Sequence, residues 1–208
     1  AATPAQGAGA APAPARRALS LDAGKADLLP YFVEDLESQL DRLGEQIERL
    51  AGETDRVALA DEVEELGRGL SATIDFFEFD SMLGMTEALV STAASAARAG
   101  AVDLDQLMPR MRAVLTILES QAGGLGEGTL IDADSGSLIE RLRRMAATGR
   151  AEEEWRLPEG ADVETVLRFD GVPPVPRKPD GPATPTPVGE PAARGGAGDP
   201  APDDPPGG

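Results

Sequence analysis

A group of charged and hydroxyl side chains around Arg68 is the part of the sequence best suited to bind a partner. Within two helical turns of Arg68 the chain carries Glu64, Glu65, Ser71 and Asp75. Residues three or four positions apart are neighbours on the surface of a helix. An arginine stays protonated at physiological pH and has no free lone pair, so it cannot act as a base or nucleophile. The chemistry predicted for this surface is charge recognition.

Other kinds of chemistry find little support in the composition. The 208 residues include no cysteine and no histidine, which excludes disulfides, thiol nucleophiles, phosphohistidine and Ser-His-Asp triads. The carboxylate run 152–154 is interpreted as solvated charge, because acid-base catalysis needs carboxylates held in a cleft. The motifs of phosphate loops, zinc sites and calcium loops are absent from the sequence. We expect no catalytic residue, no metal, no cofactor and no enzyme activity of the domain itself.

The overall charge and hydropathy exclude two classes of partner. The formal net charge is -18, from 19 basic and 37 acidic residues, which argues against nucleic acid because phosphates must be neutralised by lysine or arginine. No segment approaches the roughly 20 consecutive apolar residues of a membrane span. We therefore expect a cytoplasmic protein that binds neither nucleic acid nor membrane.

The helix that carries Arg68 is predicted from apolar residues spaced alternately by three and four: Leu59, Val63, Leu66, Leu70, Ile74 and Phe77. Arg68 is two residues from Leu66 and from Leu70, a rotation of roughly 200°, so it is expected to point to solvent. Gly67 and Gly69 weaken this helix by about 1 kcal/mol each relative to alanine. Packing through Leu66 and Leu70 is expected to hold this turn.

Four further helices are predicted. One begins near Asp27, with Pro30 in its first turn, and ends near Gly52; another runs from Asp80 to about Ala97. The next begins near Asp105, so that Pro109 lies in its first turn, or it kinks at the proline. A glycine-rich stretch at 123–128 is expected to be a flexible break. A short last helix is expected to open with a capping box at 137–140.

These helices predict an all-α fold, an antiparallel up-down bundle of four main helices and a short fifth over residues 19–148. Residues 1–18 are predicted to be a disordered lead rich in Ala and Pro, and residues 149–208 a Pro/Gly-rich acidic linker or tail. Only a weak extended segment is suggested near 166–169. Phe76, Phe77 and Phe79 are expected to close one end of the bundle.

The stretch from Arg68 to Phe79 resembles the histidine-phosphotransfer (HPt) domain of chemotaxis histidine kinases. In that family an exposed histidine opens the run His-x-Leu-Lys-Gly-small-small, and a Gly-Phe pair follows further on. When Gly-Phe is set on Glu78-Phe79, the family's leucine falls on Leu70 and its phosphoacceptor histidine falls on Arg68. The chain thus resembles a degenerate HPt domain whose phosphoacceptor has been replaced.

Most other residues that touch phosphate in the family also differ. The family's lysine, its following glycine, a later glycine and the glutamate that orients the histidine fall on Ser71, Ala72, Asp75 and Val90. The resemblance implies the helical scaffold of the phosphorelay domain without its phosphate chemistry.

The resemblance implies a non-phosphorylatable HPt-like module of a chemotaxis or two-component signalling protein. Its partner would be a response-regulator receiver domain or a histidine kinase domain, bound through Glu64, Glu65, Arg68, Ser71 and Asp75. The competing interpretation of Arg68 is a surface arginine paired with Glu64 or Glu65, worth only about 0.3–0.5 kcal/mol.

Two alternative functions remain open. The first is a structural bundle that forms a homodimer or spaces domains. The second, less favoured, is a receiver phosphatase, which needs a carboxylate or amide to orient the attacking water. The chain has no asparagine, and none of its glutamines is expected beside Arg68: Gln39, Gln46, Gln106 and Gln121.

Overall fold

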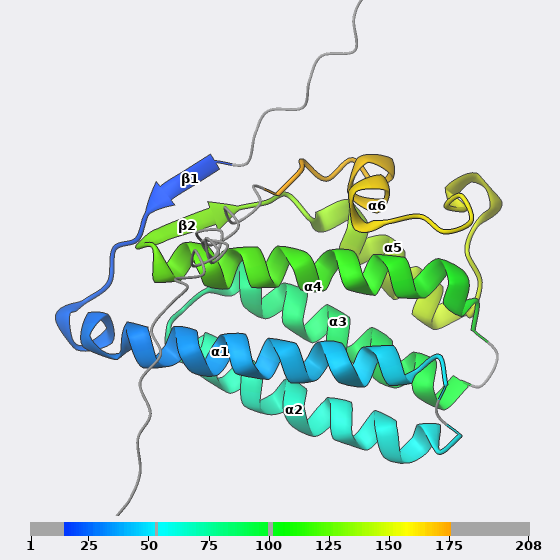
Figure 1. The fold of residues 1–208 in the computed structure, drawn as a ribbon, viewed down its shortest axis with the longest axis horizontal. Coiled ribbons are helices and arrows are strands. Elements are labelled where there is room, and N and C mark those ends of the chain that lie inside the picture. Colours follow the sequence, from blue (N-terminus) through cyan, green and yellow to red (C-terminus); the bar gives the residue numbers. More distant parts are fainter. Residues whose placement is uncertain (1–14, 53, 100–101, 176–208) are drawn as a thin grey trace, which may run out of the picture. The chain divides into compact units, whose positions relative to one another are not determined.

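The structure, a computed structural model, describes residues 15–52, 54–99 and 102–175 and is an all-α helical bundle. Within these residues the elements follow in the order β1 (Ala15–Ala18), α1 (Ala23–Arg49), α2 (Arg56–Phe76), α3 (Asp80–Ala99), α4 (Leu104–Gly126), β2 (Thr129–Asp132), α5 (Gly136–Thr148), the 3-10 helix η1 (Glu153–Trp155) and α6 (Val163–Phe169). The first four helices run alternately up and down (Figure 1). The predicted fold class is therefore confirmed.

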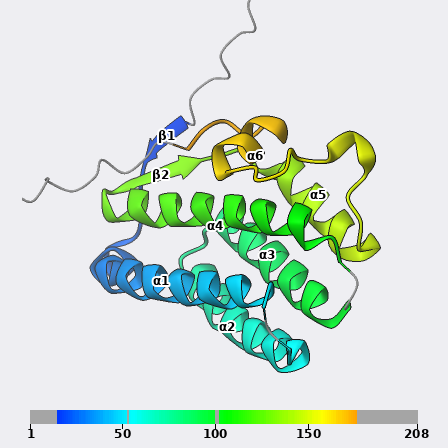
Figure 2. The ribbon, with the colours of Figure 1, turned by 45° about the vertical axis from the view of Figure 1, so that its right-hand side comes forward.

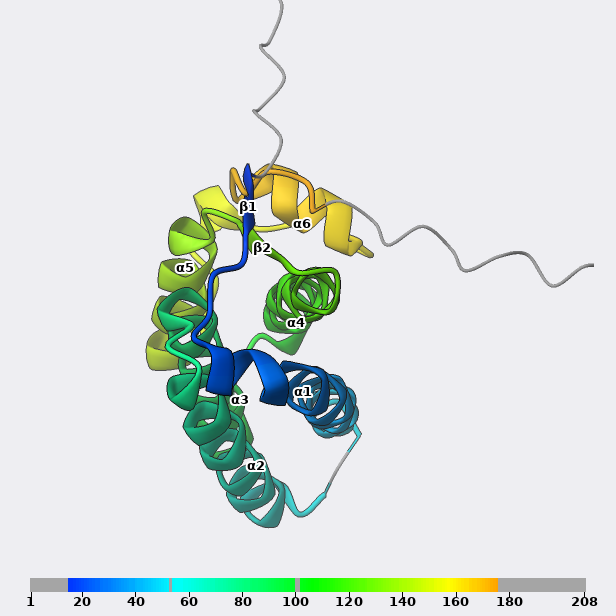
Figure 3. The same ribbon diagram turned by 90° about the vertical axis from the view of Figure 1, so that its left-hand side faces the viewer.

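The helices form two packed layers. Helices α2, α3 and α5 lie next to one another in one layer, and α1 and α4 form the other, as the end view shows (Figure 3). Helix α6 packs on the side of α4 that faces away from α1 (Figure 2). The predicted Arg68 helix is α2, so the surface around Arg68 belongs to the three-helix layer.

Helix α1 begins four residues earlier than predicted. Its N-cap is Asp22, whose side chain accepts a hydrogen bond from the backbone N–H of Lys25 at 2.9 Å. This cap satisfies one of the free N–H groups at a helix start. Pro30 consequently lies inside the helix and not in its first turn. Helix α4 likewise begins at Leu104, and Pro109 lies in its second turn.

The core between the layers is mainly aliphatic, with one aromatic cluster at the end where α2 turns into α3. Phe77 and Phe79 are buried there, and the ring of Phe77 lies 4.2 Å from that of Phe32 on α1. Phe76 differs from the prediction because its side chain is 55% exposed. Two of the three predicted phenylalanines therefore close the bundle, and the third faces solvent.

The segment after α4 is ordered, contrary to the predicted flexible break at 123–128. Helix α4 continues through Gly126, and Gly124 fits closely against Ile131: a Cβ at Gly124 would lie 3.0 Å from that side chain. Strand β2 then pairs antiparallel with β1, with Arg16 opposite Ile131. The last four residues of the predicted lead, 15–18, are thus part of the fold.

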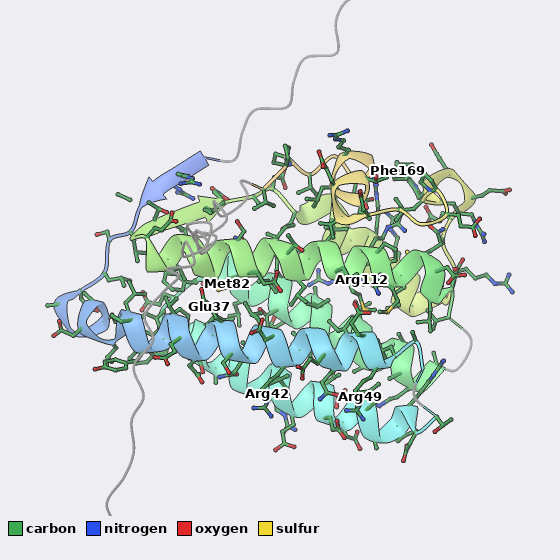
Figure 4. The ribbon with its side chains drawn as sticks, viewed as in Figure 1. Glu37, Arg42, Arg49, Met82, Arg112 and Phe169 are labelled. Atoms are coloured by element: carbon green, nitrogen blue, oxygen red, sulfur yellow. The ribbon has the colours of Figure 1, made fainter. Side chains whose placement is uncertain are left out.

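The boundary predicted at residue 148 is also too early. Within the predicted tail, η1 and α6 follow α5, and Val166, Leu167 and Val172 are buried in the same core as the main helices. Phe169, the last residue of α6, has 37% of its surface exposed (Figure 4). The segment 166–169 is helical, not extended. The predicted lead before residue 15 and the predicted tail after 175 lie outside the described residues.

The predicted capping box at 137–140 is not formed. Helix α5 starts at Gly136 with Ser135 as its N-cap, and the hydroxyl of Ser137 donates to the backbone carbonyl of Asp170. Ser137 thus ties α5 to the end of α6 and does not cap its own helix. None of the helices in the described ranges is both long and apolar enough to cross a membrane.

Candidate functional site

Arg68 lies in the middle of α2 with its side chain exposed to solvent, as predicted. Its Nε donates to the backbone carbonyl of Glu64 at 3.4 Å. No ion pair of Arg68 is found in the part of the chain that the structure describes, although its charge contributes to lowering the pKa of Glu64. The guanidinium keeps most of its donors for an external partner.

The carboxylate of Glu64 is instead bound by an arginine of the neighbouring helix. Arg98, in the last turn of α3, donates through Nη1 to Glu64 Oε1 at 2.5 Å and through Nη2 to Asp61 Oδ1 at 3.1 Å. The hydrogen bond from Arg98, with the charges of Arg98 and Arg68, lowers the pKa of Glu64, and Glu64 and Asp61 raise the pKa of Arg98. The charge of Arg98 is thus balanced by two carboxylates, and it is the guanidinium of Arg68 that this surface offers to a partner.

The other predicted site residues lie on the same outward side of α2. Glu65 and Asp75 are exposed, and Ser71 is half-buried. No hydrogen bond or ion pair joins Ser71 or Asp75 to Arg68 within the described residues. The structure thus places all five predicted residues on one accessible surface, and we call this surface, Glu64, Glu65, Arg68, Ser71 and Asp75, the Arg68 surface.

Gly67 explains how α2 and α3 come together at this level. A Cβ built on Gly67 would lie 2.4 Å from Cγ1 and 3.0 Å from Cβ of Val90. The helices therefore touch at Gly67 and Val90, and position 90 lies directly beside the turn that carries Arg68. Leu70 is buried and Leu66 is only partly buried, so the predicted packing is assisted by a glycine contact that the prediction omitted.

Gln39 of α1 lies nearer to this region than predicted. A Cβ on Gly69 would be 3.6 Å from Gln39 Oε1, whereas the amide Nε2 of Gln39 donates to Asp35. The Cα of Gly69 thus faces Gln39 of α1, and Arg68, the preceding residue, lies about 100° around the helix axis from Gly69. The amide is therefore next to the Arg68 turn but on its α1 side.

A second charged cluster, which the sequence analysis missed, joins α4, α5 and α6. The side chain of Arg110 on α4 is fully buried, and its Nε lies 3.4 Å from Oδ2 of the equally buried Asp170. Arg141 of α5 binds the other oxygen, Oδ1, of Asp170, and its guanidinium lies 3.8 Å from the centre of the Trp155 ring. Arg110 also donates to the backbone carbonyl of Trp155. One carboxylate thus serves two guanidinium groups.

The ion pair between Glu64 and Arg98 makes a testable pH-dependence. Because the pKa of Glu64 is lowered from its usual value of 4.5, this carboxylate stabilises the fold above that pH and the contribution is lost as pH falls through the lowered pKa. We expect Arg98→Gln to move the pKa of Glu64 back toward 4.5 in a carbon-13 NMR titration. In urea unfolding, Glu64→Gln should be less stable than the parent at pH 7, and the difference should shrink as the pH falls below 4.5. An unchanged Glu64 pKa in Arg98→Gln would contradict this ion pair.

No group of three or more carboxylate, histidine or cysteine side chains that could hold a metal ion is present in the described ranges. Comparisons with protein-family models, with curated proteins and with solved structures find no match to the chain.

Proposed function

We propose that the chain is a non-phosphorylatable HPt-like module that docks a response-regulator receiver domain or a histidine kinase domain in the cytoplasm. The observation that carries the proposal is the exposed guanidinium of Arg68 at the middle of a helix in a two-layer bundle, which forms no ion pair with any residue that the structure describes. An arginine cannot accept a phosphoryl group from an aspartyl phosphate, since it has no free lone pair. The module therefore acts by binding alone.

The surroundings of Arg68 support recognition of an acidic pocket. Ser71 on the next turn of α2 adds a hydroxyl donor, and Arg98 on the neighbouring helix holds the carboxylates of Glu64 and Asp61, which reduces their repulsion of an acidic partner. Val90 occupies the position that the resemblance gives to the glutamate that orients the histidine, and it is apolar and packed on Gly67. Position 90 therefore offers no carboxylate that could orient a side chain of α2.

Removal of the Arg68 charge tests this proposal. We expect Arg68→Gln to weaken binding of a chemotaxis receiver domain about tenfold or more, the usual effect of truncating one partner of a charge pair in an interface. The measurement is isothermal titration calorimetry with the same receiver. The matched control is Arg112→Gln: Arg112 is also half-exposed, but it lies on α4, where it pairs with Glu48 of α1 (Figure 4). Equal affinities of both variants and the parent would refute docking through Arg68.

A structural dimer is the second candidate, and one observation favours it. Leu28, Tyr31 and Phe76 are 48%, 72% and 55% exposed, which is unusual for large apolar side chains. Leu28 and Tyr31 are one turn apart on α1, and the amine of Lys25 in the preceding turn lies 5.7 Å from the Phe76 ring. Sedimentation equilibrium distinguishes the two candidates. A molecular mass of the parent that rises with protein concentration, together with a Phe76→Ser variant that stays monomeric, would favour the dimer over the docking module.

A further inference from the structure

A small cavity between α5 and the η1 segment is lined by four arginines. Its volume is about 20 Å³, and its walls include the four arginines Arg110, Arg141, Arg144 and Arg150, the ring of Trp155 and one carboxylate, that of Glu152. The cavity opens to solvent because Arg144 and Arg150 are exposed. We call it the arginine pocket. It lies outside the Arg68 surface and plays no part in the docking proposed above.

The charges in and behind the arginine pocket do not balance. Arg110 and Asp170 are fully buried and Arg141 is nearly so, with 14% of its side chain exposed. Asp170 and Glu152 supply two negative charges against the four guanidinium groups of Arg110, Arg141, Arg144 and Arg150. Arg110 and Arg141 share the single carboxylate of Asp170, so an additional anion would offset more of the cost of removing their charges from water.

The two outer arginines retain donors for such an anion. Arg150 has no ion pair in the described part of the chain, and Arg144 is bound to Glu152 only by a contact of 3.4 Å between half-exposed groups. The guanidinium of Arg141 stacks on the indole ring of Trp155, and this contact leaves the N–H groups at the edge of the guanidinium free to donate hydrogen bonds. In a chain whose formal net charge is -18, this is an unusual concentration of positive charge.

We propose that the arginine pocket binds one phosphate group, either free phosphate or the phosphate of a monoester. Planar guanidinium forks match the oxygens of phosphate and make charge-assisted hydrogen bonds to them. A cavity of about 20 Å³ has room for a single small group, so any larger part of the ligand lies outside. The recognised chemistry is therefore a phosphate dianion held at Arg141, Arg144 and Arg150.

Trp155 is the only tryptophan of the chain and provides the readout. Sodium phosphate is titrated into the 208-residue chain at constant ionic strength, with sodium chloride as the balancing salt, while tryptophan fluorescence is recorded. We expect a saturable change for the parent. Arg150→Gln should weaken the phosphate affinity about tenfold, as expected for loss of one hydrogen bond to a charged group. Arg150 is exposed, so the variant keeps the fold, which circular dichroism checks.

Arg143→Gln is the matched control, since Arg143 is an exposed arginine of the same helix that pairs with Glu140 and does not line the pocket. It should bind phosphate like the parent. A fluorescence change that sodium chloride reproduces, or an equal loss in Arg143→Gln and Arg150→Gln, would overturn the proposal. The same titration with O-phosphoserine identifies the source: comparable affinity supports a monoester ligand, and binding of inorganic phosphate alone supports free phosphate.

Discussion

Replacing Asp170 by asparagine is expected to lower the free energy of unfolding by about 3–5 kcal/mol, the usual cost of removing one partner of a buried ion pair. Asparagine nearly keeps the size of the side chain but removes its charge. Arg110 would then be buried with no counter-charge, and Arg141 would lose the carboxylate that it binds. Urea unfolding measures the change, and hydrogen exchange should show faster exchange in α6 and in the segment around Trp155.

Glu140→Gln is the control for this prediction. Glu140 pairs with Arg143 on the exposed side of α5, so its loss should cost no more than about 0.5 kcal/mol. If the two variants have the same stability within error, the buried cluster does not hold residues 149–172 on the bundle.

The second large effect concerns the glycines on either side of Arg68. Gly67→Ala should destabilise the protein by about 1–3 kcal/mol through overpacking, in spite of the higher helix propensity of alanine. The new methyl would meet both methyls and the Cβ of Val90, and a valine in a helix is stiff at χ1 and cannot turn away. Thermal and urea unfolding provide the measurement.

Gly69→Ala should change stability in the opposite direction. Its new methyl would make an ordinary contact of 3.6 Å with Gln39, so only the propensity gain of about 0.5–1 kcal/mol remains. A double variant, Gly67→Ala with Val90→Ala, should recover part of the loss, because the overlap is removed. A stabilising Gly67→Ala would contradict the close helix contact.

The main helices could be predicted because each carries an apolar stripe that must be buried against another helix. Helix ends and irregular segments are harder to predict, because tertiary contacts decide their structure. Helix α1 begins after the N-cap Asp22, earlier than the position of Pro30 suggests. Helix α4 continues into the predicted break at 123–128, where Gly124 packs against Ile131. Residues 149–175 have no clear periodicity, and they are ordered by burial of Val166 and by the ion pair of Asp170.

The exposure of Arg68 was predictable from its spacing to Leu66 and Leu70. Its surroundings were not, because Arg98 is 34 positions from Glu64 and reaches it only through the pairing of α2 with α3. Arg110 and Asp170 are even farther apart in the sequence, so their pairing was not predictable from local spacing either. Local spacing reports which face of a helix a residue occupies, but not which distant side chain lies opposite.

The most direct test of the account is a nitrogen-15 NMR titration of the chain with a chemotaxis receiver domain. The docking proposal predicts shift changes confined to the amides of the Arg68 surface and the neighbouring end of α3 around Arg98. Shift changes confined to α1 around Leu28 and Tyr31, or an unchanged spectrum at receiver concentrations in the millimolar range, would contradict it.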